Sequence, residues 1–252
     1  GSTPEAAGYI THFIVAGACF LSAAVVLAGL KKGTPVNKTE QLPLSQLVGA
    51  GLAAARNPRI ALAYASAFIA RGDLVVVGTF ANLWGTTAGI AAGLDPAEAS
   101  AKGRMLFAIT GIAGLFWLPL MGITGTIVCM SLAAAGFLVV NVVDDPLAPG
   151  AWIFFVFLGI GQISAFAGAA TLISQEAPIA SRGAVVGMFN TFGAVGILFG
   201  TAVGGRLFDS IGPHAVFVMV GALSVLVVLY GLWVRWKAPG PLTAGGGGFM
   251  AH

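Results

Sequence analysis

The chain has 252 residues, of which 58% are hydrophobic and only 8% are charged, and its formal net charge is +3. About a quarter of the residues in ordinary soluble domains are charged, so this composition indicates an integral membrane protein. The long apolar runs lack the alternation of barrel strands and therefore predict helices. The basic residues lie beside these runs and form no basic face, which argues against nucleic acid as a partner.

Seven apolar segments are predicted to cross the bilayer, because each has about the 20 residues that a spanning helix needs. Residues 104–141 are long enough to cross twice, with the reversal expected at 121–125. Asp95 and Pro96, with scattered charges around them, predict a loop at 85–103. Polar connections are also expected at 31–59, 175–182 and 204–213. The spans are predicted at residues 10–30, 60–84, two within 104–141, 152–173, 184–204 and 214–234.

The second span has Arg71 and Asp73 near its middle. Each charge at the centre of a spanning helix costs about 2.5 to 3.5 kcal/mol on insertion scales, so the two charges indicate either a polar path or a buried structural ion pair. Residues two apart on a helix point about 200° away from each other, so other helices must supply their partners. One of two helix faces is expected to line a cavity: Tyr64, Arg71, Gly78 and Asn82, or Ser66, Asp73, Val77, Phe80 and Trp84.

Other spans contain isolated polar side chains. Gln162 and Ser164 lie midway along their span and Asn190 lies a third of the way along its own, where they can bind a solute or a neighbouring helix. His12 and His214 lie near span ends, far apart in the sequence. No Cys/His/Glu cluster, Ser/His/Asp arrangement or phosphate-binding glycine loop occurs. We therefore expect no metal site, no cofactor and no enzymatic activity.

The basic residues predict the orientation, because Lys and Arg are retained in the cytoplasm. One side of the spans collects eight of them, and the other side has three together with six acidic residues. The start of the chain is thus expected outside and the C-terminus in the cytoplasm, in a bacterial inner membrane. The chain opens without an initiator methionine or a signal peptide, so we expect it to be a fragment of a longer gene product.

A shift of 204 residues aligns the first span with the last. Parallel repeats about 200 residues apart are typical of transporters made of two six-span halves. The sequence therefore predicts the end of one half followed by all of the next. The matched pairs are Gly8 with Gly212, Phe13 with Phe217, Gly17 with Gly221, Ala18 with Ala222 and Pro35 with Pro239.

Two motifs occur within residues 174–217. One has the pattern E-x-P-x-x-x-R-G from Glu176 to Gly183, and the other has the pattern G-G-x-L-x-D-x-x-G from Gly204 to Gly212. Together with residues 70–73 they resemble the major facilitator superfamily of transporters, over essentially the whole chain as helices six to twelve. The motif residues are Glu176, Pro178, Arg182, Gly183, Gly204, Gly205, Leu207, Asp209 and Gly212.

This resemblance implies an all-α membrane protein with seven transmembrane helices. Residues 1–34 would be the last helix of the N-terminal half, residues 35–59 a cytoplasmic linker between the halves, and residues 60–237 the C-terminal six-helix bundle. Residues 238–252 would form a flexible tail. The rest of the N-terminal half is expected outside this chain, as a partner of the bundle.

The resemblance also implies a secondary active transporter, a proton-coupled permease for a small organic solute. Asp73 is the expected proton-coupling carboxylate, because burial favours its neutral form, and Arg71 is the expected contact for an anion. Tyr64, Phe80 and Trp84, with few charges around them, favour an organic solute. The predicted solute and ion pathway comprises Arg71, Asp73, Tyr64, Asn82, Trp84, Gln162 and Asn190. The predicted conformational gate comprises Glu176, Arg182, Gly183 and Asp209, in which Glu176 and Arg182 would pair or bind the positive end of the following helix.

Two other classes of protein fit the span count. A seven-helix receptor or photoreceptor is one, although a retinal protein would need a lysine within a span, and the predicted spans have none. The other is a membrane subunit without transport activity, whose bundle is completed by another chain.

Overall fold

The computed structural model describes residues 4–29, 43–117 and 125–238, and every regular element in these ranges is helical. The predicted all-α fold is therefore confirmed. The chain contacts define two compact units, residues 1–43 and 44–252, each of which is described by itself.

The first unit contains one described helix, α1 (Pro4–Gly29), which agrees with the first predicted span. Its apolar side chains, among them Phe13, Phe20 and Leu27, are exposed within the structure. A helix that is apolar all round is typical of a membrane span, because lipid can surround it. Gly8 lies inside this helix whereas Gly212 precedes α9 with a φ of 121°, so these two aligned glycines differ in their backbone roles.

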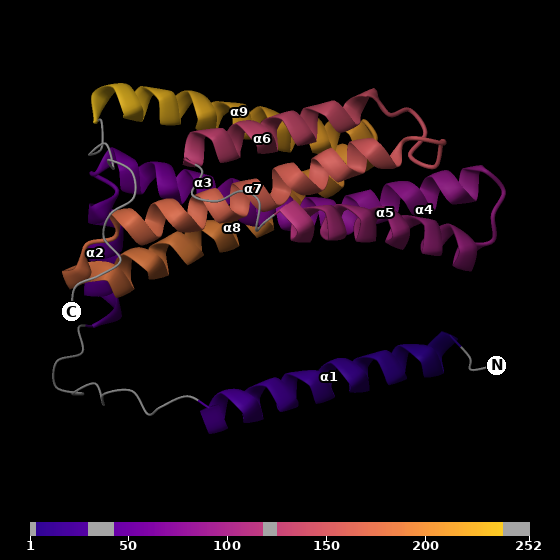
Figure 1. Ribbon diagram of the computed structural model, residues 1–252, viewed down its shortest axis with the longest axis horizontal. Helices are drawn as coiled ribbons and strands as arrows, with labels where there is room; N and C mark the ends of the chain where they lie inside the picture. The colour runs from indigo at the N-terminus through magenta and orange to yellow at the C-terminus, as the bar shows by residue number, and fades with distance from the viewer. Residues whose placement is uncertain (1–3, 30–42, 118–124, 239–252) are drawn as a thin grey trace. The chain divides into compact units, whose positions relative to one another are not determined.

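The second unit is a bundle of helices that pack side by side (Figure 1). Its longest continuous segment joins α3, a π-helical turn η2 and α4 without a break. The described elements are α2 (Leu44–Ala54), α3 (Pro58–Val75), η2 (Val76–Ala81), α4 (Asn82–Ala91), α5 (Pro96–Trp117), α6 (Thr126–Val139), the 3₁₀ turn η4 (Val140–Val142), α7 (Trp152–Glu176), the 3₁₀ turn η5 (Ile179–Ser181), α8 (Arg182–Ser210) and α9 (Pro213–Lys237).

The prediction of a loop at residues 85–103 is largely wrong. Helix α4 continues to Ala91, and a turn with Gly93 at a φ of 83° leads into α5. The carboxylate of Asp95 accepts hydrogen bonds from two backbone N–H groups in the first turn of α5, at 2.9 and 3.1 Å. The Asp-Pro pair is thus a helix start, in which the aspartate caps the helix and Pro96 takes its first position.

Three further boundaries differ from the prediction. The connection expected at 31–59 contains helix α2, whose apolar sequence packs against α8. The connection expected at 175–182 is shorter, because α7 runs to Glu176 and α8 begins at Arg182. Helix α8 also extends to Ser210, beyond the predicted end of that span. The reversal predicted at 121–125 lies outside the described residues except for Gly125, which precedes α6.

Among the described helices, five segments are long and apolar enough to cross a membrane. The other two predicted spans are α5, which is less apolar because charges lie in its first turns, and the shorter segment Thr126–Val142. All seven predicted spans are therefore helical in the residues that the structure describes. The five segments are His12–Gly29, Pro58–Ala91, Trp152–Glu176, Ile179–Ser210 and Pro213–Lys237.

Glycines allow α3 and α8 to pack backbone against backbone. A Cβ atom on Gly72 would lie 2.8 Å from the carbonyl oxygen of Gly196, and one on Gly196 would overlap the carbonyl oxygen of Phe68. Gly200 faces the backbone of Gly72, and Gly204 faces the ring of Phe80. The three glycines of α8, spaced four residues apart, are therefore buried against α3 and η2.

Candidate functional site

Helix α3 places the two charged residues of the second span on different sides. The side chain of Asn57 caps its start by accepting a hydrogen bond from the N–H of Arg59 at 3.0 Å, and Pro58 takes the first helical position. This start fixes the register of the residues that follow. Arg71 is half-buried near the surface of the bundle, whereas Asp73 is completely buried inside it.

Arg71 joins three helices. Its guanidinium donates a hydrogen bond to the Oδ1 atom of Asn190 on α8 at 3.3 Å, and it lies over the ring of Phe166 on α7 at 5.3 Å from the ring centroid. A Cβ atom on Gly193 would lie 2.6 Å from the Cγ atom of Arg71, so this glycine leaves the room that the arginine stem occupies. The sequence predicted Arg71 and Asn190 as pathway residues, but gave no signal for Phe166 or Gly193.

Asp73 lies among apolar side chains of α3, α8 and α9. Neither carboxylate oxygen has a hydrogen-bond partner of good geometry in the part of the chain that the structure describes. Its backbone carbonyl oxygen accepts a hydrogen bond from the Nε2 atom of Gln162 on α7 at 3.4 Å. The carboxyl group lines a small cavity of about 10 Å³ with Gly196, Gly200 and Val220, which is at the lower limit for one water molecule.

A π-helical turn begins three residues after Asp73. In η2 the helix is wider than an α-helix, and the N–H of Val76 reaches the carbonyl oxygens of both Gly72 and Asp73. Single π turns inside α-helices are uncommon and occur often at functional sites. The amide of Gln162 approaches at the junction, where the helix changes its winding. The apolar pattern of residues 60–84 gave no sign of this turn.

Three predicted pathway residues lie apart from Arg71. The hydroxyl group of Tyr64 donates to the carbonyl oxygen of Gly51 at 2.9 Å, which ties α3 to α2. Asn82 accepts a hydrogen bond from Thr86 and packs against α5. Trp84 is buried in an aromatic cluster formed with Phe155, His214 and Phe217.

The aromatic residues expected to surround a cavity belong instead to the core. Tyr64, Phe80 and Trp84 are each at most 4% exposed. The side chains of bulky apolar residues are buried where helices cross, and helical spacing alone does not distinguish that surface from a cavity wall. The aromatic ring beside Arg71 belongs to Phe166 on another helix.

The predicted gate residues do not form a cluster. Glu176, at the end of α7, pairs with Arg59 at the start of α3, and not with Arg182. Arg182 and Gly183 are exposed at the start of α8, and Asp209 is exposed near its end. The prediction missed Arg59 because this residue is far from Glu176 in the sequence and appeared only as a flanking charge.

The fold is thus an all-α membrane bundle with charged and amide side chains between its helices, and such residues line solute and ion paths in many membrane proteins. The chain belongs to the Major Facilitator Superfamily, and the profile of this family matches residues 107–249, more than half of the chain.

Three curated proteins resemble the chain. It is 32% identical over 183 residues to the magnetosome protein MamH of Paramagnetospirillum magneticum, an alignment that covers 69% of this chain and 42% of MamH. It is 27% identical over 208 residues to the magnetosome protein MamZ of the same organism, covering 79% of this chain and 32% of MamZ. The MamZ protein of Magnetospirillum gryphiswaldense is 28% identical to it over 186 residues, an alignment that covers 71% of this chain and 29% of that MamZ. The chain thus spans less than half the length of these relatives. No solved structure matches it at a significant level.

Proposed function

We propose that the chain belongs to a secondary transporter in which two helix bundles rock about a site near the middle of the membrane. The observation behind this proposal is the position of Arg71, which is half-buried and held by Asn190 and Phe166. A guanidinium has five N–H donors, so one bond to an amide leaves others for a solute. Because such a group binds carboxylates with matched geometry, we infer that the solute is a small organic anion.

Asp73 is proposed as the proton-coupling group. A carboxyl group in an apolar setting costs far less to bury neutral than ionised. Its release of a proton would therefore require a change in its surroundings. The π turn after Asp73 and the hydrogen bond from Gln162 support such a change, because both act on the backbone at this residue. We infer that the movement of α3 against α8 and α9 exposes and covers this carboxyl group during transport.

The gate is proposed at the exposed ends of α8. The ion pair between Glu176 and Arg59 lies within one bundle, so it fastens α7 to α3 and does not join two halves. Arg182 and Gly183 at one end of α8 and Asp209 at the other remain exposed and able to meet a second bundle. They lie about 40 Å apart along the helix, at 1.5 Å per residue. We therefore propose that they contact the second bundle in opposite conformations of the transporter.

We infer that the second bundle is an N-terminal half, encoded beside this chain or supplied as a separate partner. The relatives are more than twice as long as the part that this chain matches, which supports such a half. The balance of basic residues favours a cytoplasmic C-terminus in a bacterial inner membrane. Because the relatives are named as magnetosome proteins, a membrane of that kind is a second proposed location.

The experiment that tests this function replaces Asp73 by Asn in the chain within its native gene context. Purified protein in liposomes would be given a proton gradient and a labelled pool of small mono- and dicarboxylates. We expect Asp73→Asn to abolish accumulation driven by the gradient while exchange across the membrane persists. Asp144→Asn, an exposed loop change, is the matched control. Gradient-driven accumulation by Asp73→Asn at the wild-type rate would refute the coupling role.

The anion contact is tested separately with Arg71→Lys and Arg71→Gln. Lysine keeps the charge but loses the planar fork, so we expect weakened solute binding with Arg71→Lys and its loss with Arg71→Gln. The measurement is the concentration of solute that gives half-maximal exchange. Equal values for wild type and Arg71→Gln would show that Arg71 does not bind the solute.

A further inference from the structure

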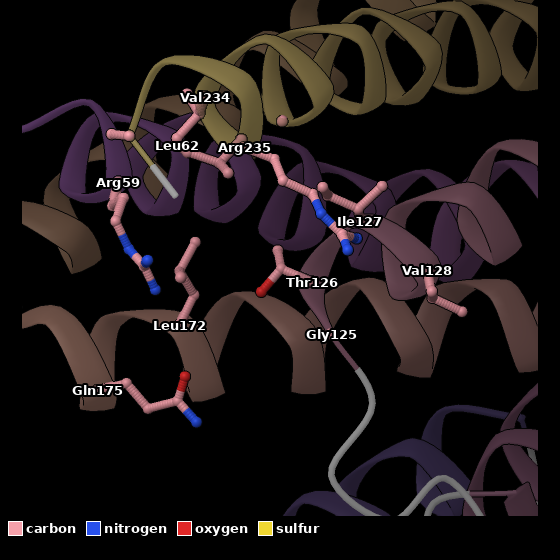
Figure 2. Close-up of a pocket in the computed structure, with 12 residues that line it drawn as sticks. Arg59, Leu62, Gly125, Thr126, Ile127, Val128, Leu172, Gln175, Val234 and Arg235 are labelled. Carbon is pink, nitrogen blue, oxygen red and sulfur yellow. The ribbon is translucent and has the colours of Figure 1, made fainter. Parts of the chain in front are cut away.

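A pocket with two arginines opens at one end of the helix bundle of the second unit (Figure 2), and neither Arg71 nor Asp73 lines it. Its volume is about 230 Å³, and it is lined by terminal residues of α3, α6, α7 and α9. Arg59 is the second residue of α3, Thr126 is the first of α6, and Gln175 and Arg235 lie in the last turns of α7 and α9. Because the ends of spanning helices lie at the headgroup region of the bilayer, the pocket lies at that depth.

The charges of this end pocket favour an anion. Arg59 is paired with Glu176, so these two charges balance. Arg235 has no ion-pair partner among the residues that the structure describes, and its side chain extends toward Thr126 and Ile127 (Figure 2). The Nε atom of Arg59 is buried and has no hydrogen-bond partner within the described ranges. The pocket therefore has one unbalanced positive charge, that of Arg235.

The remaining walls of the end pocket are apolar. They come from Leu62, Ile127, Leu172 and Val234 (Figure 2). A free phosphate ion would gain no hydrophobic free energy from such walls. The glycerol and first methylene groups of a lipid would cover this apolar surface, and each Å² removed from water stabilises binding by about 25 cal/mol. Trp236 is exposed beside Arg235, as expected for an anchor at the membrane interface.

We propose that the end pocket binds the phosphodiester headgroup of one anionic phospholipid, with the unpaired guanidinium of Arg235 as its donor. Basic pockets between spanning helices are suited to such lipids, because the charge attracts the headgroup and the helices accommodate the chains. This site is independent of the solute path, so it stands whether or not Arg71 binds a solute. It fastens the starts of α3 and α6 to the ends of α7 and α9.

The test measures bound lipid on the purified chain in nanodiscs by native mass spectrometry after release from the disc. The probes are phosphatidylglycerol, phosphatidylcholine and soluble glycerol phosphate. Arg235→Gln removes the unbalanced charge, and Arg56→Gln is the matched control, because Arg56 is exposed at the same end of the bundle but lies outside the pocket. We expect Arg235→Gln to lower retention of phosphatidylglycerol about tenfold, because one charge-assisted hydrogen bond is lost. Arg56→Gln should leave the retention unchanged.

A second variant separates binding from folding. Ile127→Trp, at a partly buried position of the apolar wall, should fill the pocket, so it is expected to displace phosphatidylglycerol while both arginines remain. Equal loss with Arg235→Gln and Arg56→Gln would overturn the proposal, since general surface charge would then explain retention. Retention of phosphatidylcholine equal to that of phosphatidylglycerol would also overturn the proposal. Binding of glycerol phosphate without retention of phosphatidylglycerol would overturn it as well.

Discussion

A single methyl group on Gly196 should weaken the packing of α3 against α8. In Gly196→Ala the new Cβ atom would overlap the carbonyl oxygen of Phe68, which is backbone and cannot rotate away. Overpacking of this kind costs about 1 to 3 kcal/mol. Alanine also favours a helix over glycine by up to about 1 kcal/mol, which acts in the opposite direction. A control in the same helix must therefore remove the second effect.

Gly205→Ala provides that control, because nothing lies within 4 Å of a Cβ atom at Gly205. Both changes are made in α8, so the helix-propensity gain largely cancels in the difference between the two variants. We expect Gly196→Ala to be less stable than Gly205→Ala by about 1 to 3 kcal/mol, or about 5- to 150-fold in the unfolding equilibrium. The assay is reversible unfolding of the purified chain by dodecyl sulfate in mixed micelles, followed by tryptophan fluorescence.

The close approach of the two helices would be refuted by equal stability of the two variants within about 0.5 kcal/mol, the usual range for a surface change. Gly72→Ala extends the test to α3, since its Cβ atom would lie 2.8 Å from the carbonyl oxygen of Gly196. It should be destabilised to a similar degree.

Three further changes test other parts of the bundle. Tyr64→Phe should cost about 1 kcal/mol, because the hydrogen bond to Gly51 is lost, and unchanged stability in the same unfolding assay would argue against that contact. Trp84→Ala should cost about 3 to 5 kcal/mol because it leaves a cavity in the core, whereas the exposed Trp236→Ala should have little effect; similar melting curves for the two would contradict this. Glu176→Gln should cost at most about 1 kcal/mol, since its ion pair is partly exposed, and a larger loss by the same assay would mean a more deeply buried contact.

The sequence predicted the helical class, and five of its seven predicted spans are long and apolar enough as helices to cross a bilayer. It failed at element boundaries. The start of α5 was missed because Asp95 and Pro96 were interpreted as a loop, although their chemistry is also that of a helix N-terminus. Helix α2 was missed because its 11 residues are too few for a span.

The candidate site was only partly predictable. Arg71 and Asp73 stood out because charges are rare in spanning helices, and Asn190 and Gln162 stood out because they are polar. Their partners did not. Phe166 and Arg59 look ordinary in the sequence, and only helix packing brings them to Arg71 and Glu176. The sequence assigned Tyr64 and Trp84 to a cavity wall. Helical spacing shows which residues share one face of a helix, but it does not show whether that face borders a cavity or another helix.

If Arg71 binds the solute as proposed, the surface beside it is open to water, and the accessibility of Asn190 tests this directly. Cysteine would replace Asn190 in the chain within its native gene context, after Cys19 and Cys129 have been changed to serine. A charged thiol reagent reacts with the thiolate, which forms in water and not in lipid. We expect Asn190→Cys to be labelled rapidly and Leu229→Cys, an exposed apolar position on α9, to be unreactive. An unreactive Asn190→Cys would show that this surface is closed to water and would contradict a solute site at Arg71.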